Sequence, residues 1–277
     1  MTFSIVARGV HTSGRTAYGV AVASRFLAVG SAVPAVDAVA GAIATQSMAN
    51  LAYRPQGLTL LRTGTAAADV VAGLTAADPL RAERQLGVVG ADGDGATYTG
   101  DGCLDWAGGT TGDGFAIQGN ILAGPAVVEA MRTAYLAAAG PLAHRLLAAL
   151  RAGDEAGGDR RGRQSAALLV ASPGAGYGGL SDIAVDLRVD DHPDPVPELA
   201  RLLDLHHLYF DRPDPDALLD LTGDLATEVA DRLARLGHTG ADALADWAGI
   251  ENFEERLVPG RIDPLVLGQL RAATEET

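Results

Sequence analysis

The order of strand-like and helix-like segments constrains the fold of this chain more than any other feature of its sequence. Runs with strand patterning come first, two helical segments follow, and the same succession of a strand group and a helix pair then repeats before a last strand. A doubly wound parallel sheet would instead alternate one strand with one helix. The order therefore predicts an α+β fold of four layers, αββα, in which two mostly antiparallel sheets pack face to face between helices.

The individual segments follow from hydrophobic spacing and from turn residues. We expect hairpins between residues 2–8 and 17–24 and between residues 85–91 and 96–99, the second turning at Asp92-Gly93-Asp94-Gly95. The other expected strands are 39–46, 115–118, 166–171 and 183–189. The expected helices are 50–63, 66–74, one that begins near Pro125, 141–151 and 196–208.

A change in composition predicts a second domain. The segment Asp211-Arg212-Pro213-Asp214-Pro215 reads as a linker, and the patterning beyond it is purely helical, at 218–236, 241–248 and 264–271. We therefore expect residues 1–212 to form the layered domain and residues 213–277 to form a small all-α domain.

Charge and composition exclude several classes of function. The net charge of −14 disfavours nucleic acid and anionic membranes as partners. All 21 basic residues are Arg, which removes mechanisms that need a lysine, such as a Schiff base or a P-loop. The six His lack the spacing of a metal site, so we expect neither a metal nor a cofactor. Cys103 is the only cysteine, and we assign it to packing. No segment has signal-peptide or membrane character, so a cytoplasmic location is expected.

Thr2 is the first candidate for chemistry, because it opens the strand-like run 2–8. If Met1 is removed, Thr2 carries a hydroxyl nucleophile and a free α-amine, whose pKa of about 7.7–8.0 suits a general base. The alternative is that Thr simply happens to occupy the second position.

Other candidates lie at strand ends and in a glycine-rich loop. Gln46, Gln118 and Asn120 end expected strands, where amides suit an oxyanion hole or a polar substrate; a plain turn is the alternative. The loop 157–165 carries Asp159, Arg160, Arg161 and Ser165, which suit the binding of a carboxylate or the orientation of a nucleophile. A solvated arginine patch is the alternative there. Asp190-Asp191-His192 could bind a metal, but helix capping is favoured.

Several of these motifs together resemble a known bacterial family. The segments are Thr-Phe-Ser-Ile-Val-Ala-Arg at 2–8, Ala-Thr-Gln-Ser at 44–47, Arg84-Gln85, Thr99-Gly100, Gln118-Gly119-Asn120, Gly-Gly-Asp-Arg-Arg-Gly-Arg-Gln-Ser-Ala-Ala-Leu at 157–168, and Asp-Leu-Arg-Val-Asp-Asp-His at 186–192. They are similar to the family labelled domain of unknown function 1028, which is placed by fold among the N-terminal nucleophile (Ntn) hydrolases. The remainder resembles a helical extension described as peptidoglycan-binding.

The resemblance implies the same four-layer sandwich and suggests roles for the candidates. Thr2, Asn120 and Asp159 would be catalytic, and Gln46, Gln118, Arg160, Arg161 and Ser165 would bind substrate. The implied activity is hydrolysis of a small amide-containing metabolite by a homo-oligomer; the alternative is a non-catalytic binding or assembly module. The sequence departs from the family at Gly9, where relatives usually carry an Asp that could orient the nucleophile.

Overall fold

The computed structural model describes residues 2–275. The chain divides into two compact units, one up to Leu202 and one from Leu203 onward. The boundary between the two units falls inside helix α6 (Pro195–Phe210), whereas the sequence predicted a linker at 211–215.

The first unit contains a six-stranded antiparallel sheet in the order β10-β9-β2-β1-β8-β7. Its strands are β1 (Thr2–Val10), β2 (Thr16–Ser24), β7 (Gly108–Gly112), β8 (Phe115–Asn120), β9 (Ser165–Ala171) and β10 (Ile183–Val189). Side chains alternate between the two faces of β1. Phe3 points toward α5, beside Gly153, whereas Val6 points into the core between the sheets.

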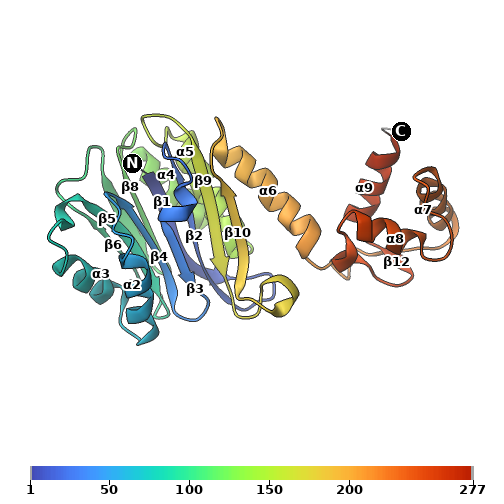
Figure 1. Ribbon diagram of the computed structural model, residues 1–277, viewed down its shortest axis with the longest axis horizontal. Coiled ribbons are helices and arrows are strands. Elements are labelled where there is room, and N and C mark those ends of the chain that lie inside the picture. Colours follow the sequence, from blue (N-terminus) through green and yellow to red (C-terminus); the bar gives the residue numbers. More distant parts are fainter. Residues whose placement is uncertain (1, 276–277) are drawn as a thin grey trace. The chain divides into compact units, whose positions relative to one another are not determined.

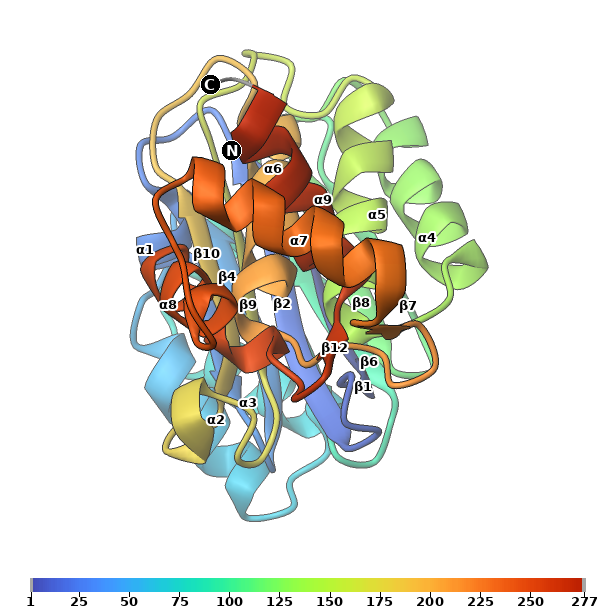
Figure 2. The ribbon, with the colours of Figure 1, turned by 90° about the vertical axis from the view of Figure 1, so that its right-hand side faces the viewer.

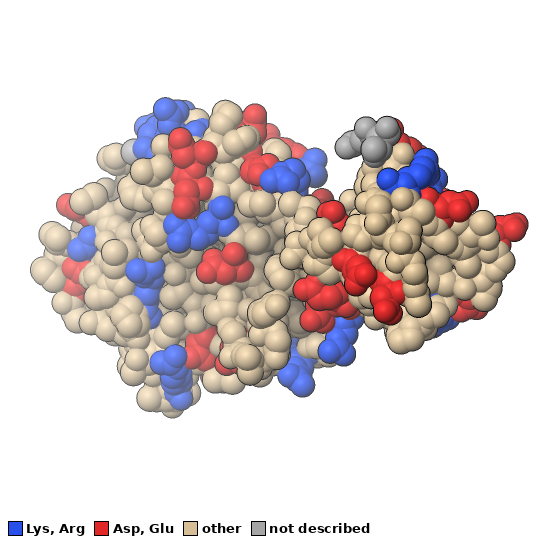
Figure 3. All heavy atoms as spheres, turned by 45° about the vertical axis from the view of Figure 1, so that its right-hand side comes forward, with Lys and Arg blue, Asp and Glu red and all other residues tan. Residues whose placement is uncertain are grey.

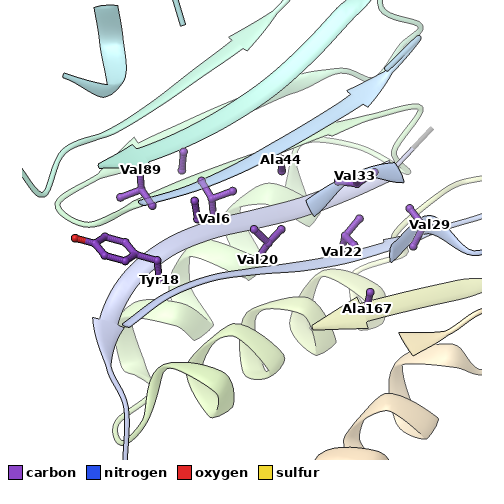
Figure 4. Packing of buried hydrophobic residues seen from close by; sticks show 11 residues of the cluster. Val6, Tyr18, Val20, Val22, Val29, Val33, Ala44, Val89 and Ala167 are labelled. Atoms are coloured by element: carbon purple, nitrogen blue, oxygen red, sulfur yellow. The ribbon is translucent and has the colours of Figure 1, made fainter. Parts of the chain in front are cut away.

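A second antiparallel sheet has four strands in the order β3-β4-β5-β6. They are β3 (Pro34–Asp37), β4 (Gly41–Ser47), β5 (Arg84–Gly90) and β6 (Gly95–Thr99). The two sheets bury small apolar side chains against each other, and Figure 4 shows Val6, Val20, Ala44 and Val89 among them. Such small residues let the two sheets approach closely.

Helices cover the outer face of each sheet. The helices α2 (Tyr53–Arg62) and α3 (Ala67–Ala76) lie on the four-stranded sheet, and α4 (Ala126–Ala137) and α5 (Leu142–Glu155) lie on the six-stranded one (Figures 1 and 2). The short α1 (Val29–Ala32) packs against β9, and the 3-10 turns η1 (Arg81–Glu83) and η2 (Tyr177–Gly179) lie in loops. The first unit is thus the expected α+β arrangement of four layers.

The second unit is mainly helical. It contains α7 (Gly223–Arg235), α8 (Ala243–Ile250), η3 (Glu254–Arg256) and α9 (Pro264–Glu275), packed around Leu233, Trp247 and Leu270. The expectation of a purely helical segment missed the two-residue ladder between β11 (Leu219–Asp220) and β12 (Arg261–Ile262). Strands this short leave no periodic pattern to detect.

Charged side chains of both signs lie on the surface. On the face shown in Figure 3, acidic side chains are interspersed with Arg. Among residues 2–275, no helix combines the length and the apolar character needed to cross a membrane.

Candidate active site

Four polar residues form a row across one end of the six-stranded sheet, one from each of four neighbouring strands. Thr2 on β1 pairs with Asn120 on β8, and Ser24 on β2 pairs with Ser165 on β9. The hydroxyl oxygens of Thr2 and Ser24 lie 3.1 Å apart, which joins the two halves of the row. All four residues are buried, Thr2 at 4% exposure. At the end of the sheet where β1 begins, the buried side chains are therefore polar and able to form hydrogen bonds.

A network of buried carboxamides continues from this row into the second sheet. Gln85 on β5 is its centre, because its Oε1 accepts from both Asn120 Nδ2 and Gln46 Nε2 at 2.8 Å. Gln46 Nε2 also lies 3.3 Å from the backbone oxygen of Thr2. Buried amides are stable only when their groups are paired. The network meets this need by linking β1, β4, β5 and β8.

Ser4 and Gln118 complete the network one pleat further along. Ser4 Oγ donates to Gln46 Oε1 at 2.6 Å and accepts from Gln118 Nε2 at 2.6 Å. Gly87 on the facing strand makes room for Gln118, since a Cβ at Gly87 would lie 2.1 Å from Gln118 Oε1. This glycine is required by the close approach of the two sheets.

The glycine-rich loop approaches the row from the side of β2. Asp159 Oδ2 accepts from the backbone N–H of Arg25, the residue after Ser24, at 2.9 Å. The same carboxylate accepts from the backbone N–H and the guanidinium of Arg161. Asp159 is buried, at 6% exposure, and its charge is balanced by Arg161 of the same loop. Its bond to the Arg25 backbone holds the loop beside Ser24.

A strained turn follows Asn120 and meets the same loop. Ile121 has a φ of 49°, which is unfavourable for a β-branched residue. Its carbonyl oxygen accepts from the backbone N–H of Arg160 at 3.1 Å, and Leu122 pairs with Asp159. Non-glycine residues in such conformations cluster at functional sites. The turn connects Asn120 to Arg160 through a single intervening residue.

A cavity of about 530 Å³ opens at this end of the sheet. Its walls include Phe3, Ser24, Asp159 and Arg160. Thr2 is not among the lining residues. Two of its neighbours are: Phe3, the next residue in the chain, and Ser24, on the adjacent strand β2. Met1, whose removal the sequence argument requires, lies outside the described residues.

The structure thus brings most of the predicted site residues to one end of the sandwich, in two groups. Gln46, Gln118 and Asn120 belong to the buried network with Thr2, whereas Asp159, Arg160 and Arg161 form the loop beside the cavity. Ser165 belongs to the row, but its hydroxyl donates to the backbone oxygen of Phe26 and accepts from the backbone N–H of Val29 at 3.1 Å. Its position favours a structural function for that hydroxyl.

Gly9, where relatives usually carry an Asp, lies away from this site. Gly9 sits against Leu142 near the opposite end of β1, about 23 Å from Thr2 at ~3.3 Å per residue. An Asp at position 9 would therefore not reach Thr2.

Cys103 is half-buried rather than a core residue, and its Sγ lies 3.4 Å from the backbone oxygen of Arg84. His192 Nδ1 accepts from the backbone N–H of Asp194. Within residues 2–275, no cluster of His, Cys, Asp and Glu is arranged to hold a metal ion.

Three residues of this arrangement were not predicted as site residues from the sequence: Ser4, Ser24 and Gln85. A signal for Ser24 was present, because the expected hairpin places the end of the second strand opposite Thr2. Gln85 contacts Asn120 across the interface between the sheets, and one sequence carries no direct signal for that contact.

Comparisons with known proteins agree with the layered fold. Residues 2–199 match a family of unknown function, DUF1028, and residues 209–270 match the "Putative peptidoglycan binding domain". The crystal structure of a protein from Silicibacter pomeroyi, assigned to DUF1028, is similar, with a TM-score of 0.66 and 33% sequence identity. The similarity covers 81% of this chain and 88% of that one. The search of curated proteins finds no match.

Proposed function

We propose that this chain, which belongs to the DUF1028 family, is an N-terminal nucleophile hydrolase that cleaves an amide bond of a small metabolite. The observation that carries the proposal is the position of the Thr2 hydroxyl. It lies at the first residue of a central strand, buried among hydrogen-bonding groups and 3.1 Å from Ser24 Oγ, at the end of the sheet where a cavity opens. The Ntn-type layering implied by the family supports the same conclusion by analogy.

Removal of the residue before Thr2 would give the site its base. The Thr2 Oγ then attacks the amide carbonyl carbon while the hydroxyl proton passes, through a water, to the α-amine. The C–N bond breaks, the leaving amine takes that proton, and an acyl ester remains on Thr2. A water molecule hydrolyses the ester, which releases a carboxylic acid and restores the hydroxyl.

The neighbouring residues have distinct parts in this proposal. Asn120 is the candidate oxyanion donor, and its amide is held by Gln85. Asp159 is a positioning residue, because its carboxylate is occupied by Arg25 and Arg161 and keeps the loop beside Ser24. Ser24 orients the Thr2 hydroxyl. Gln46 and Gln118 lie inside the network, where they would act by positioning the backbone of Thr2 and of Ser4.

The proposal is tested by the N-terminus and by trapping of the acyl-enzyme. We expect the intact mass of the protein purified from cells to correspond to a chain that begins at Thr2. We expect p-nitrophenyl acetate to give a burst of about one equivalent per chain, with the acetyl group mapped to Thr2 by peptide mass analysis. Thr12→Ala, in the exposed turn between β1 and β2, is the matched control and should retain the burst.

Two results would overturn the proposal: a cellular protein that retains a residue before Thr2, or a full burst in Thr2→Ala. The first would favour a non-catalytic binding or assembly module. Homo-oligomeric assembly and cytoplasmic location stay predictions of the sequence.

A further inference from the structure

We infer that the cavity beside Ser24 binds a carboxylate group of its ligand through Arg160. The inference deepens the proposed function by naming a substrate class, amides that also carry a free carboxylate. It rests on the proposed function only in treating the ligand as a substrate; the anion site is argued from the cavity itself.

The acidic residues of the cavity are already neutralised. Three carboxylates line it, and each has its own guanidinium partner: Asp154 with Arg163 at 2.8 Å, Asp159 with Arg161 at 2.8 Å, and Glu155 with Arg151 at 2.9 Å. Arg163 also contacts Asp194 at 3.0 Å. The hydrogen bond to Asp154 raises the pKa of the Arg163 guanidinium. Each carboxylate that lines the cavity is therefore already paired with a guanidinium.

Arg160 differs from these arginines. Its guanidinium makes no hydrogen bond or ion pair with any residue in the range 2–275, although the chain has a net charge of −14. Its backbone is fixed, because its N–H donates to the carbonyl oxygen of Ile121. A positive side chain on a fixed backbone, facing a cavity whose acids are already paired, is suited to an anionic ligand.

The position of Arg160 relates this anion site to the candidate nucleophile. Ile121, which holds the Arg160 backbone, directly follows Asn120, the pairing partner of Thr2. Asp159, on the other side of Arg160, is held by the residue after Ser24. Both connections bring Arg160 to the end of the sheet that carries the Thr2 hydroxyl.

The other walls of the cavity indicate the rest of the ligand. Phe3, Ala23, Pro193 and Pro195 supply apolar surface. The volume of about 530 Å³ lies within the range of small-molecule sites, on the order of 300–1,000 Å³. A compact amide with an apolar side chain and one carboxylate, such as an N-acyl amino acid, matches this combination.

Binding is tested with pairs of probes of nearly equal size, one with a carboxylate and one with a neutral carboxamide. The probes are N-acetylglycine, N-acetylleucine and N-acetylphenylalanine, each compared with its neutral carboxamide. Titration calorimetry with the wild-type protein and with Thr2→Ala measures affinity with and without the candidate nucleophile. We expect at least one acid to bind about tenfold or more tightly than its carboxamide, as a charge-assisted pair requires.

Variants then assign the effect to Arg160. Arg160→Gln should remove the preference for the acid, Arg160→Lys should keep part of it, and Arg132→Gln, which removes an exposed arginine on α4, should keep all of it. Because Arg160 is exposed, these variants should melt like the wild type.

The outcomes separate the two proposals. Equal affinity for acid and carboxamide, an undiminished preference in Arg160→Gln, or no binding of any acid at millimolar concentration would overturn the anion site, even if acyl-enzyme forms on Thr2. Arg160-dependent binding of an acid without acyl-enzyme formation would uphold the anion site and count against the hydrolase.

Discussion

Asn120 and Gln85 belong to different sheets, yet Asn120 Nδ2 donates to Gln85 Oε1 at 2.8 Å. Gln85 Nε2 in turn donates to the backbone oxygen of Gly119 at 2.7 Å, so the same side chain holds both Asn120 and the residue before it. The orientation of the candidate oxyanion donor is therefore set by the opposite sheet.

Because of this contact, we expect Gln85→Leu to lower the free energy of unfolding substantially. The substitution keeps an apolar body of similar length but leaves Asn120 Nδ2 without its acceptor and takes one acceptor from Gln46 Nε2. We expect a loss of about 2–4 kcal/mol in the free energy of unfolding, measured by urea denaturation. Gln164→Leu, on a partly exposed side chain that bonds Asp191, should change it by less than about 0.5 kcal/mol. Equal effects of the two substitutions would contradict the central role of Gln85.

The hydroxyl of Thr2 can be tested separately from its amine. Thr2→Ser keeps a hydroxyl beside the same α-amine and should retain part of the esterase burst, whereas Thr2→Ala should lose it. The wild-type rate should rise with pH through the pKa of the amine, about 7.7–8.0 or lower if the site is partly desolvated. Thr2→Ser should share this profile. A rate that shows no rise anywhere between about pH 5 and pH 9 would exclude the amine as base.

We expect Asp78 to account for part of the loss of folding stability at acid pH. Its carboxylate accepts from Arg84 Nε at 2.8 Å, Asn50 Nδ2 at 3.0 Å and the Tyr53 hydroxyl at 2.9 Å. The hydrogen bond from Arg84 is the main cause that lowers the pKa of Asp78 below its usual range, while burial opposes it. A lowered folded-state pKa stabilises the protein above the unfolded value, near pH 4, and this stability is lost as pH falls toward the folded value.

Asp78→Asn removes this contribution. We expect the variant to be less stable than the wild type at neutral pH, and the difference to shrink at each step below about pH 4 in urea denaturation. Asp101→Asn, in an exposed loop, is the matched control and should follow the wild-type curve. A difference that stays constant with pH would show that Asp78 acts through packing rather than through its charge.

The extent of the second unit can be tested with fragments. Arg256 donates to the backbone oxygens of His207 and Leu208, and the Tyr209 ring lies 6.0 Å from that of Phe253. A fragment of residues 203–277 keeps these contacts, whereas residues 213–277 lose them. We expect the longer fragment to be more stable by about 2 kcal/mol or more, since each lost bond leaves part of a buried guanidinium unpaired. Equal melting curves would favour the shorter boundary.

The first unit should fold without the rest of the chain. A fragment of residues 1–212 retains Val196 and Leu199, which are buried on the first half of α6. We expect it to unfold cooperatively in urea. Aggregation of this fragment would mean that the second unit is needed to cover it.

The sequence predicted most of the strands because buried β-strands in this fold are apolar runs bounded by turn residues. β3 and β7 were missed for a physical reason. β3 is four residues long, β7 reads Gly-Gly-Thr-Thr-Gly, and both lie at the edges of their sheets, where packing demands little of the sequence.

The site was predictable to the extent that it depends on strand ends. Thr2, Gln46, Gln118 and Asn120 were found because each lies at or near the end of a strand. The different environments of Arg160 and Arg161 could not be read from two adjacent identical letters. They arise because the loop turns Arg161 back onto Asp159 and leaves Arg160 facing the cavity.

The polar row fixes Thr2 by strand pairing on both sides of β1, and this has a practical consequence for expression. An amino-terminal affinity tag would leave β1 paired and the protein well folded, with a normal melting curve. In the proposed mechanism, the same tag would convert the reactive amine into an ordinary peptide nitrogen. A screen of amino-terminally tagged protein would then record an inactive enzyme with no structural defect, so purification handles for this protein belong at the carboxyl terminus.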